Sequence, residues 1–277
     1  MASEMMTVRQ ALNEATRAIE AIGPTPRLDA ELLMAHALGL SREAMLLGHM
    51  DAPAPAGFDA LLARRLGHEP IAYIIGHRAF WTIDLAVAPG VLIPRPDSET
   101  LIEAAIDHFG EGAPGDILDL GVGSGALLLA ALSEWPMARG LGIDASPGAV
   151  AIAQDNADRL DLADRVEIRI GDWAEGVDRM FDLVLCNPPY VESIATLARE
   201  VADHEPASAL YAGPDGLDDY RRLAPMLPRL IAPGGMAAIE IGADQAAAVL
   251  ALFADEGLAG TVRQDLGGRD RCIVLTR

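Results

Sequence analysis

Apolar positions in the first part of the chain recur at intervals of three and four, which places them on one face of a helix. Gly23 and Pro24 end the first such pattern, Gly39 ends the second, and Ser41 is a suitable N-cap for the third. We therefore predict a small N-terminal helical bundle. Its helices are expected over residues 1–22, 28–38, 41–47 and 58–66.

From about residue 97 onward, short apolar runs alternate with stretches of helical periodicity. That rhythm is typical of an α/β fold with a doubly wound, mostly parallel sheet. Short β-like pieces at residues 79–85 and 92–93 indicate a hairpin-like connector, so we expect three parts, residues 1–72, 73–96 and 97–277. The last two strands read as a hairpin. Seven strands are predicted, near residues 116–120, 140–143, 165–170, 181–186, 236–241, 258–263 and 271–276.

A glycine-rich turn follows the first of these strands and precedes an apolar helix. Glycine lets the backbone approach a ligand, and a helix N-terminus offers unpaired N–H groups. Ala126 stands where the dinucleotide-binding pattern needs its third glycine, so the spacing favours a ligand without a pyrophosphate. Asp144 ends the next strand, where a carboxylate can bind the two ribose hydroxyls. The predicted cofactor site comprises Asp119, Gly121, Val122, Gly123, Ser124, Gly125 and Asp144.

The fourth strand leads into the sequence Asn187-Pro188-Pro189-Tyr190. An Asn side chain offers one acceptor and one donor group, which match a planar nitrogen such as a carboxamide or an exocyclic base amine. Pro188 restricts Asn187 to an extended conformation and leaves its own carbonyl free to accept from the same nitrogen. Tyr190 can close an apolar lid. A simple Pro-rich turn is the alternative interpretation, which the glycine motif makes the weaker one.

These two motifs, with Asp144 and the pair Asp172-Trp173, resemble the class I methyltransferases that use S-adenosylmethionine and act on planar nitrogens. Further segments, spread over nearly the whole chain, resemble one family of these enzymes in particular, the peptide chain release factor glutamine methyltransferases. Val122 departs from the Thr of that family, and residues 212–214 depart from its Gly-Gly pair. These further segments are Phe80-Trp81, residues 92–100, His204-Glu205-Pro206, Ala209-Leu210, Asp215-Gly216-Leu217, Gly268-Arg269-Asp270-Arg271 and residues 27–33.

The resemblance implies a Rossmann-like sheet of seven strands, one of them antiparallel, with S-adenosyl-L-methionine as cofactor and S-adenosyl-L-homocysteine as product. It implies that Asp144 binds the ribose, that Asp172 and Trp173 lie near the adenine, and that Arg95 and Glu99 border the cleft. The implied reaction methylates the side-chain amide nitrogen of the glutamine in the Gly-Gly-Gln motif of class 1 peptide chain release factors. Its implied catalytic and substrate-binding residues are Asn187, Pro188, Pro189 and Tyr190.

The net charge of the chain indicates its class of substrate and says little about its fold. The chain carries a net charge of −20, and all 21 of its basic residues are arginine. Without lysine it has neither a Walker lysine nor a Schiff-base lysine. So acidic a surface repels phosphate backbones over long range and attracts a basic protein. We therefore expect a protein substrate and no direct nucleic-acid partner.

Cysteine use and hydropathy indicate a cytoplasmic protein. Cys186 and Cys272 are the only cysteines and are flanked by apolar residues, so neither a disulfide scaffold nor a metal site is expected. Cys186 is interpreted as a small buried hydrophobic residue, not as a nucleophile. No apolar run reaches the roughly 18 residues of a membrane span, and the first residues lack a basic signal-peptide head. We expect no membrane partner, and a monomer.

The catalytic motif leaves alternative functions open. A ribosomal protein offers glutamine side chains with the same chemistry. Methylation of an exocyclic base amine in DNA or RNA would use the same motif, although it would favour a basic groove. A cofactor-binding module without activity is a further alternative, which the complete Asn-Pro-Pro-Tyr sequence disfavours.

Overall fold

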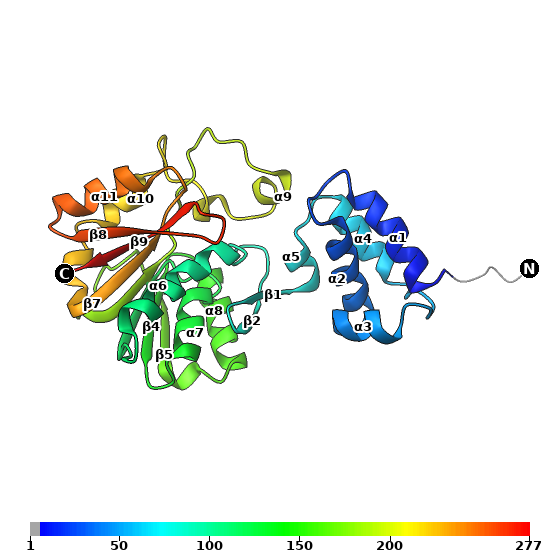
Figure 1. Cartoon of the computed structure of the whole chain (residues 1–277), viewed down its shortest axis with the longest axis horizontal. Helices are drawn as coiled ribbons and strands as arrows, with labels where there is room; N and C mark the ends of the chain where they lie inside the picture. The colour runs from blue at the N-terminus through cyan, green and yellow to red at the C-terminus, as the bar shows by residue number, and fades with distance from the viewer. Residues whose placement is uncertain (1–5) are drawn as a thin grey trace, which may run out of the picture. The chain divides into compact units, whose positions relative to one another are not determined.

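The computed structural model describes residues 6–277 and divides into two compact units. The first unit runs to His77 and also contains Leu197–His204, a segment that returns to it from later in the chain. The second unit comprises Arg78–Thr196 and Glu205–Arg277. Figure 1 shows a helical first unit and a second unit built around a sheet.

The helices of the first unit follow the apolar spacing closely. The first begins at Val8, because Thr7 accepts a hydrogen bond from the N–H of Gln10 in a capping box. It ends at Ile19 instead of residue 22, and residues 1–5 of its predicted range lie outside the described residues. Ser41 caps its helix as predicted. The helices are α1 Val8–Ile19, α2 Pro26–Leu38, α3 Arg42–Gly48, α4 Phe58–Leu66, α5 Ile71–Ile75 and the short α9 Arg199–Ala202.

The buried charged side chains of the first unit, Asp29, Glu31 and Arg65, form ion pairs. Arg65 is 3% exposed and forms ion pairs with Asp29 at 2.8 Å and with Glu200 of α9 at 2.8 Å. Glu31, which is also buried, accepts hydrogen bonds from two arginines at 2.5 and 2.7 Å. Such pairing offsets the hydration that each charge loses. The pair of Arg65 and Glu200 attaches the returning segment to the bundle.

A seven-stranded sheet with the order β5-β4-β3-β6-β7-β9-β8 forms the second unit. All neighbours run parallel except β9, which is antiparallel to both β7 and β8. The doubly wound fold with one antiparallel strand and a final hairpin is therefore confirmed. The strands are β3 Asp116–Leu120, β4 Arg139–Asp144, β5 Val166–Ile170, β6 Phe181–Cys186, β7 Ile231–Glu240, β8 Ala259–Gln264 and β9 Asp270–Thr276.

Helices cover both faces of this sheet (Figure 1). In β6, Leu183 and Leu185 pack in the cluster under α6, α7 and α8, whereas Val184 and Cys186 pack in the cluster under α10 and α11. Burial on both faces explains why inner strands such as β6 are largely apolar runs. These helices are α6 Glu99–Phe109, α7 Ala126–Glu134, α8 Pro147–Arg159, α10 Asp218–Leu223 and α11 Ala246–Asp255, with 3-10 turns η1 Pro96–Ser98, η2 Ala163–Arg165, η3 Ala207–Ala209 and η4 Leu227–Arg229.

The segment before the large sheet differs from its prediction at Ile71–Ile75, which forms the helix α5, and at residues 92–93. The strands β1 His77–Phe80 and β2 Ile83–Ala86 form a two-stranded sheet. The predicted β-piece at residues 92–93 was wrong, because that stretch has no strand. Instead, the N–H of Ile93 donates to the Glu205 carboxylate at 3.3 Å, and the prolines at 94 and 96 have no N–H to give to a ladder.

Residues 6–277 contain no helix that is long and apolar enough to cross a membrane. Within the same residues, no group of three or more His, Cys, Asp or Glu side chains is placed to hold a metal ion.

Candidate active site

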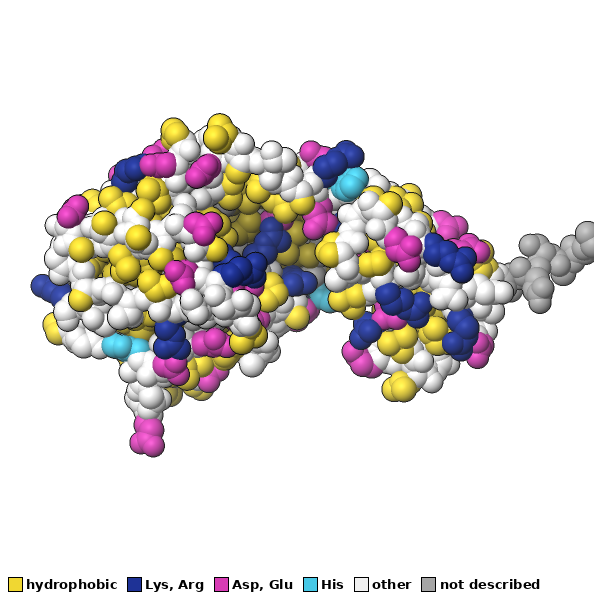
Figure 2. All heavy atoms as spheres, turned by 45° about the horizontal axis from the view of Figure 1, so that its top comes forward, with side chains coloured by type: hydrophobic (Ala, Val, Ile, Leu, Met, Phe, Trp, Pro, Cys, Tyr) yellow, Lys and Arg dark blue, Asp and Glu magenta, His cyan; other side chains and the backbone are white. Residues whose placement is uncertain are grey.

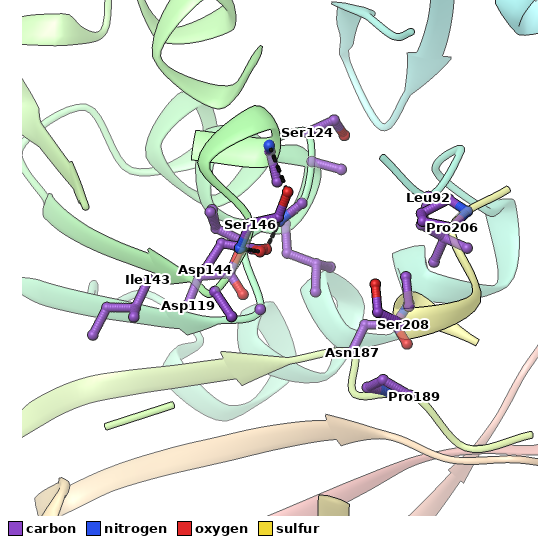
Figure 3. A pocket seen from close by; sticks show the side chains of 18 of the residues that line it. Leu92, Asp119, Ser124, Ile143, Asp144, Ser146, Asn187, Pro189, Pro206 and Ser208 are labelled. Carbon is purple, nitrogen blue, oxygen red and sulfur yellow. Dashed lines mark hydrogen bonds between the residues drawn. The ribbon is translucent and has the colours of Figure 1, made fainter. Parts of the chain in front are cut away.

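A cavity opens at the carboxyl ends of the central strands of the second unit. From β3 the chain builds outward to β4 and β5 on one side and then to β6 on the other, and open α/β sheets bind ligands at such a switch point. The cavity measures about 260 Å³, compared with about 30 Å³ for one water molecule. In Figure 3, Asp119, Asp144 and Ser146 lie on one side, and Asn187, Pro189 and Ser208 lie on the other.

The glycine-rich loop lines the cavity between β3 and α7. Gly121 and Gly125 have φ angles of +77° and +88°, in the left-handed region that favours glycine. A Cβ on Gly125 would come within 2.8 Å of the Leu129 side chain, so the close approach of loop and helix requires glycine there. The N–H groups of Gly121 and Val122 donate to the carbonyl of Ile143 at 2.8 and 3.0 Å, which fixes the loop to β4.

The other side chains of this loop shape its backbone. Val122 is 4% exposed, and its Cγ2 would lie 2.9 Å from a Cβ at Gly142, so valine packs into space that this glycine leaves. Ser124 is buried too, and its carbonyl accepts a hydrogen bond from the Asn156 side chain at 2.9 Å. The buried Val122 side chain therefore supports the loop from below by apolar packing.

Asp119 is a buried carboxylate with an unused acceptor. Its Oδ2 accepts the N–H of Leu128 in the first turn of α7 at 3.2 Å. Its Oδ1 is buried and has no hydrogen-bond partner within the described part of the chain. Burial raises the pKa of Asp119 to about 8, and the charge of Asp144 adds to the shift. The cavity therefore contains an acidic group that a cationic ligand would return to its ionised form.

Asp144 holds the turn on the other side of the glycine loop. Its Oδ2 accepts the N–H of Gly123 and its Oδ1 accepts the N–H of Ser146, both at 2.9 Å. Each carboxylate oxygen has two lone pairs, so both remain able to accept one further hydrogen bond. The side chain is partly exposed at the cavity wall.

Trp173 packs beside the glycine loop and lines the same cavity. Its φ of +47° is unusual for a bulky residue, and a Cβ on Gly121 would lie 3.5 Å from its ring. The adjacent Asp172 accepts two hydrogen bonds from Arg222 at 2.6 and 2.7 Å, and both side chains are about half exposed. Desolvation raises the pKa of Asp219, and a hydrogen bond from the Trp173 side chain acts in the opposite direction.

Asn187 lies across the cavity from Asp119 and Asp144 (Figure 3). Its Nδ2 donates to the Ser98 hydroxyl at 3.3 Å. Tyr190, from the same loop, donates through its hydroxyl to Glu240 at 3.3 Å, and desolvation raises its pKa to about 12, so the phenol stays neutral. The adjacent Cys186 is fully buried and its pKa is raised well above the ordinary value, mainly by desolvation, so it has little thiolate character.

Arg95 and Glu99 make structural contacts at the edge of the site. Arg95 pairs with the buried Glu205 at 2.5 Å, which ties residues 92–95 to the loop carrying residues 206–209. Glu99 accepts the N–H of Trp81 at 2.8 Å. Their neighbours Pro94 and Ser98 are among the residues that line the cavity, whereas Arg95 and Glu99 are not.

Several residues that sequence reasoning missed support the Asn187 loop. Gln245 donates to the carbonyls of Tyr190 at 3.0 Å and Gly216 at 3.2 Å. Glu240 is 1% exposed and bonds both Ser98 and Tyr190. The sequence offers one signal for Glu240, which is an acid at the end of an apolar strand, β7. Its partners lie too far away in sequence for a local pattern to reveal them.

Two family models match the chain. The PrmC N-terminal domain matches residues 10–76, and the methyltransferase small domain matches residues 97–204. Solved structures share the fold of the second unit at low identity. A methyltransferase from Pyrococcus furiosus has a TM-score of 0.52 at 17% identity, covering 77% of this chain and 95% of its own. A 16S rRNA methyltransferase of T. thermophilus has a TM-score of 0.51 at 20% identity, covering 73% and 49%.

Curated relatives match over most of both chains. The release factor glutamine methyltransferase of Rhodospirillum rubrum is 48% identical, over 91% of this chain and 79% of its own. Its counterpart from Caulobacter vibrioides is 46% identical over 90% and 89%, and that from Moorella thermoacetica is 42% identical over 98% and 99%. Identity at this level and over this length establishes common ancestry and fold. The chain therefore belongs to the release factor glutamine methyltransferase family.

Proposed function

We propose that this enzyme transfers a methyl group from S-adenosylmethionine to the side-chain amide nitrogen of the glutamine in the Gly-Gly-Gln motif of class 1 peptide chain release factors. One observation carries the proposal. A single cavity is lined by the glycine-rich loop and the buried carboxylate of Asp119 on one side and by Asn187 and Pro189 of the Asn-Pro-Pro-Tyr loop on the other. The names of its relatives supply the substrate class.

The residues of the glycine loop fit the proposed cofactor. The unpartnered Oδ1 of Asp119 suits the α-ammonium of the methionine part, because a buried carboxylate gains most from a cation. The free lone pairs of Asp144 suit the ribose hydroxyls, and the Trp173 ring with Asp172 beside it suits the adenine. When bound, S-adenosylmethionine supplies an electrophilic methyl group on a sulfonium. These residues would hold it with that methyl group toward Asn187.

Asn187 and Pro188 would position the acceptor nitrogen. A carboxamide nitrogen is a poor nucleophile because its lone pair is delocalised into the carbonyl. The Asn187 Oδ1 and the Pro188 carbonyl can accept both hydrogens of the substrate NH₂ and hold its lone pair in line with the methyl group. They also favour the positive charge that develops on nitrogen. The proton can leave to water after transfer, so no strong base is required.

Surface charge also favours a protein substrate. Acidic and arginine side chains are interspersed over each unit on the face seen in Figure 2, and the chain as a whole carries −20 charges. A phosphate backbone would meet net repulsion, whereas a basic protein would be attracted. We also propose that the helical bundle, residues 1–72, recognises the body of the release factor while the cavity receives the glutamine.

Methyl transfer to defined substrates tests the activity. The full-length enzyme is incubated with methyl-labelled S-adenosylmethionine and, separately, with a release factor, a ribosomal protein fraction, or duplex and single-stranded nucleic acid. Label is expected on the release factor and is expected to disappear when its Gly-Gly-Gln glutamine is replaced by alanine. Label on nucleic acid or on ribosomal protein, with none on the release factor, would overturn the proposal.

A truncated enzyme tests the role of the bundle. Removal of residues 1–72 is expected to reduce methylation of the intact release factor at least tenfold and to leave cofactor affinity and the slow methylation of a short Gly-Gly-Gln peptide nearly unchanged. Calorimetry with the cofactor shows whether the truncated protein is folded. An equal loss on both substrates from a protein that still binds cofactor would contradict a docking role.

A further inference from the structure

Glu240 occupies the last position of β7, beside the Asn187 loop. The register of β6 and β7 pairs Cys186 with Ile239, so the next residues along the two strands, Asn187 and Glu240, are level with each other. On the other side, β7 pairs with β9, and Cys272 lies opposite Glu240. The sheet therefore places an acid next to the proposed catalytic loop, where it is 1% exposed.

A chain of hydrogen bonds connects this acid to Asn187. The Ser98 hydroxyl, from the 3-10 turn before α6, lies 2.5 Å from Glu240 Oε2. Asn187 Nδ2 lies 3.3 Å from the same hydroxyl. The Tyr190 hydroxyl approaches the other oxygen, Glu240 Oε1, at 3.3 Å. One buried carboxylate thus contacts both ends of the Asn-Pro-Pro-Tyr loop, directly at Tyr190 and through Ser98 at Asn187.

The direction of each bond follows from donor counts. A carboxylate only accepts hydrogen bonds, and a serine hydroxyl has a single hydrogen. That hydrogen is taken by Glu240, so Ser98 can only accept from Asn187. The Asn187 NH₂ must then face Ser98, and its Oδ1 faces away from Ser98. If the amide were rotated by half a turn, its oxygen would meet the serine lone pairs, and its NH₂ would meet the NH₂ of a glutamine substrate.

We propose that Glu240 is a positioning residue, which acts through Ser98 to orient the Asn187 amide with its oxygen available to the substrate nitrogen, and which also anchors the Tyr190 ring. The inference rests on the proposed function, because it concerns the acceptor site of that reaction. It gives a role to Glu240, which is buried beside the cavity, and to Ser98, which lines the cavity. An active site that depends on one amide orientation needs such a device, since the two ends of an amide have nearly the same shape.

The charge of Glu240 makes the device sensitive to pH. Desolvation raises the pKa of Glu240 to about 7, while the hydrogen bonds from Ser98 and Tyr190 and the charge of Arg271 act in the opposite direction. A protonated Glu240 can donate to Ser98, which frees the serine hydrogen to bond the Asn187 oxygen and hold it away from the substrate. The other titratable groups around Glu240 are Asp97 on η1, Tyr220 on α10, and Cys186 and Cys272 on β6 and β9.

Variants of the two supporting residues test the proposal. Glu240→Gln, Ser98→Ala, Ser98→Thr and the double variant Glu240→Gln/Ser98→Ala are compared with the unmodified enzyme. Turnover of a Gly-Gly-Gln peptide is measured at saturating cofactor between pH 6 and 9. Cofactor affinity and thermal unfolding show whether each variant is folded. Asp182→Asn is the matched control, because Asp182 caps N–H groups at the opposite end of the same sheet, at 2.7 and 3.0 Å.

We expect Glu240→Gln and Ser98→Ala each to lower kcat roughly tenfold to a hundredfold, as misplacement of a reacting group does, with cofactor affinity nearly unchanged. The unmodified enzyme should lose turnover as the pH falls through about 7, the pKa of Glu240, and Glu240→Gln should lack that step. The double variant should be no slower than the slower single variant, because both act on one amide. Ser98→Thr keeps the hydroxyl and should therefore retain most of the kcat of the unmodified enzyme. The control Asp182→Asn should keep the full kcat but lose stability.

Unchanged kcat in both single variants, a step in the pH profile that persists in Glu240→Gln, or fully additive losses in the double variant would overturn the inference. Those results would leave the proposed function intact, because the unmodified enzyme would still methylate the peptide. If the unmodified enzyme methylated neither the peptide nor a release factor, the proposed function itself would fail.

Discussion

The buried acids of the first unit and two acids at the cavity of the second unit, Asp119 and Glu240, are handled in opposite ways. In the first unit, Asp29 pairs with the buried Arg65 at 2.8 Å, and Glu31 pairs with two further arginines. In the cavity of the second unit, Asp119 has one backbone hydrogen bond and an unpartnered oxygen. The carboxylate of Glu240, beside the cavity, accepts hydrogen bonds from the neutral hydroxyls of Ser98 and Tyr190.

This difference separates the roles of the two groups of acids. An arginine partner at close range satisfies a carboxylate and makes it part of the framework. A carboxylate without such a partner keeps a raised pKa and an acceptor that another group can use. Desolvation raises the pKa of Asp119 to about 8 and that of Glu240 to about 7. The paired acids should therefore govern stability, and the unpaired acids should govern binding and chemistry.

The largest effect is expected from removing an arginine of the first unit. Arg65→Ala leaves Asp29 buried without its partner and releases Glu200. Loss of one member of a buried pair costs about 3–5 kcal/mol of stability, which chemical denaturation can measure. The exposed pair of Arg9 and Asp51 provides the control, since Arg9→Ala should cost no more than about 1 kcal/mol. Similar losses in the two variants would remove the distinction between framework and surface pairs.

Asn187→Ala should impair catalysis and leave stability nearly unchanged, which is the reverse of the result expected for Arg65→Ala. Because the side chain is proposed to hold the acceptor nitrogen, its removal is expected to lower methyl transfer at least a hundredfold, which corresponds to about 2.7 kcal/mol in the barrier. Cofactor affinity should stay within about tenfold, and stability should change little, since the hydrogen bond of this side chain to Ser98 is long, at 3.3 Å. Peptide methylation followed by mass spectrometry gives the rate. Near-normal turnover would show that this loop is not the catalytic element.

The fold could be predicted well from sequence, because its signals are local. Inner strands of the large sheet such as β3 and β6 are buried on both faces and therefore appear as largely apolar runs between turn residues, whereas the edge strands β5 and β8 are partly exposed. The return of residues 197–204 to the first unit could not be predicted. It depends on a contact between Arg65 and Glu200, which are 135 positions apart, and the segment around Glu200 has no periodic pattern. The β-piece expected at residues 92–93 failed for a similar reason, since a distant carboxylate takes its N–H.

The candidate site likewise contains residues that the sequence could predict and residues that it could not. The glycine loop and the Asn187 loop are local motifs, and both line one cavity with Asp144 and Trp173. Ser98 and Glu240 are 142 positions apart, and only the strand order brings them together. Supporting residues of this kind carry no local sequence pattern, because their role is defined by the partner they reach.

Asp119→Asn should strengthen the fold of the ligand-free protein while it weakens cofactor binding. Because burial raises the folded-state pKa of Asp119 to about 8, its contribution to stability is fully present below its ordinary pKa of 3.8 and is lost as the pH rises through about 8. Asparagine does not titrate, so at pH 8.5, above the folded-state pKa of Asp119, the variant should be more stable than the unmodified protein. Loss of the charged hydrogen bond should weaken cofactor binding by about 1.5–3 kcal/mol.

Thermal unfolding at pH 5, 7 and 8.5 without ligand, together with calorimetry, separates the two effects of this substitution. The stability of the unmodified protein should fall more steeply than that of the variant across this range. Parallel curves would mean that Asp119 has an ordinary pKa in the folded state. Unchanged cofactor affinity would mean that its unpartnered oxygen does not receive the ligand.

The smallest effect is expected at Asp172, whose ion pair with Arg222 lies at the rim of the cavity with each side chain 48% exposed. Both of its oxygens accept from Arg222, at 2.7 and 2.6 Å, so its charge is already balanced before the adenine binds. Asp172→Asn should change stability by no more than about 1 kcal/mol, and this difference should shrink in high salt, which screens exposed pairs. Cofactor affinity should fall only a few-fold. A loss larger than tenfold, insensitive to salt, would place Asp172 with Asp119 among the acids that bind the ligand directly, and exposure would then no longer separate the two groups.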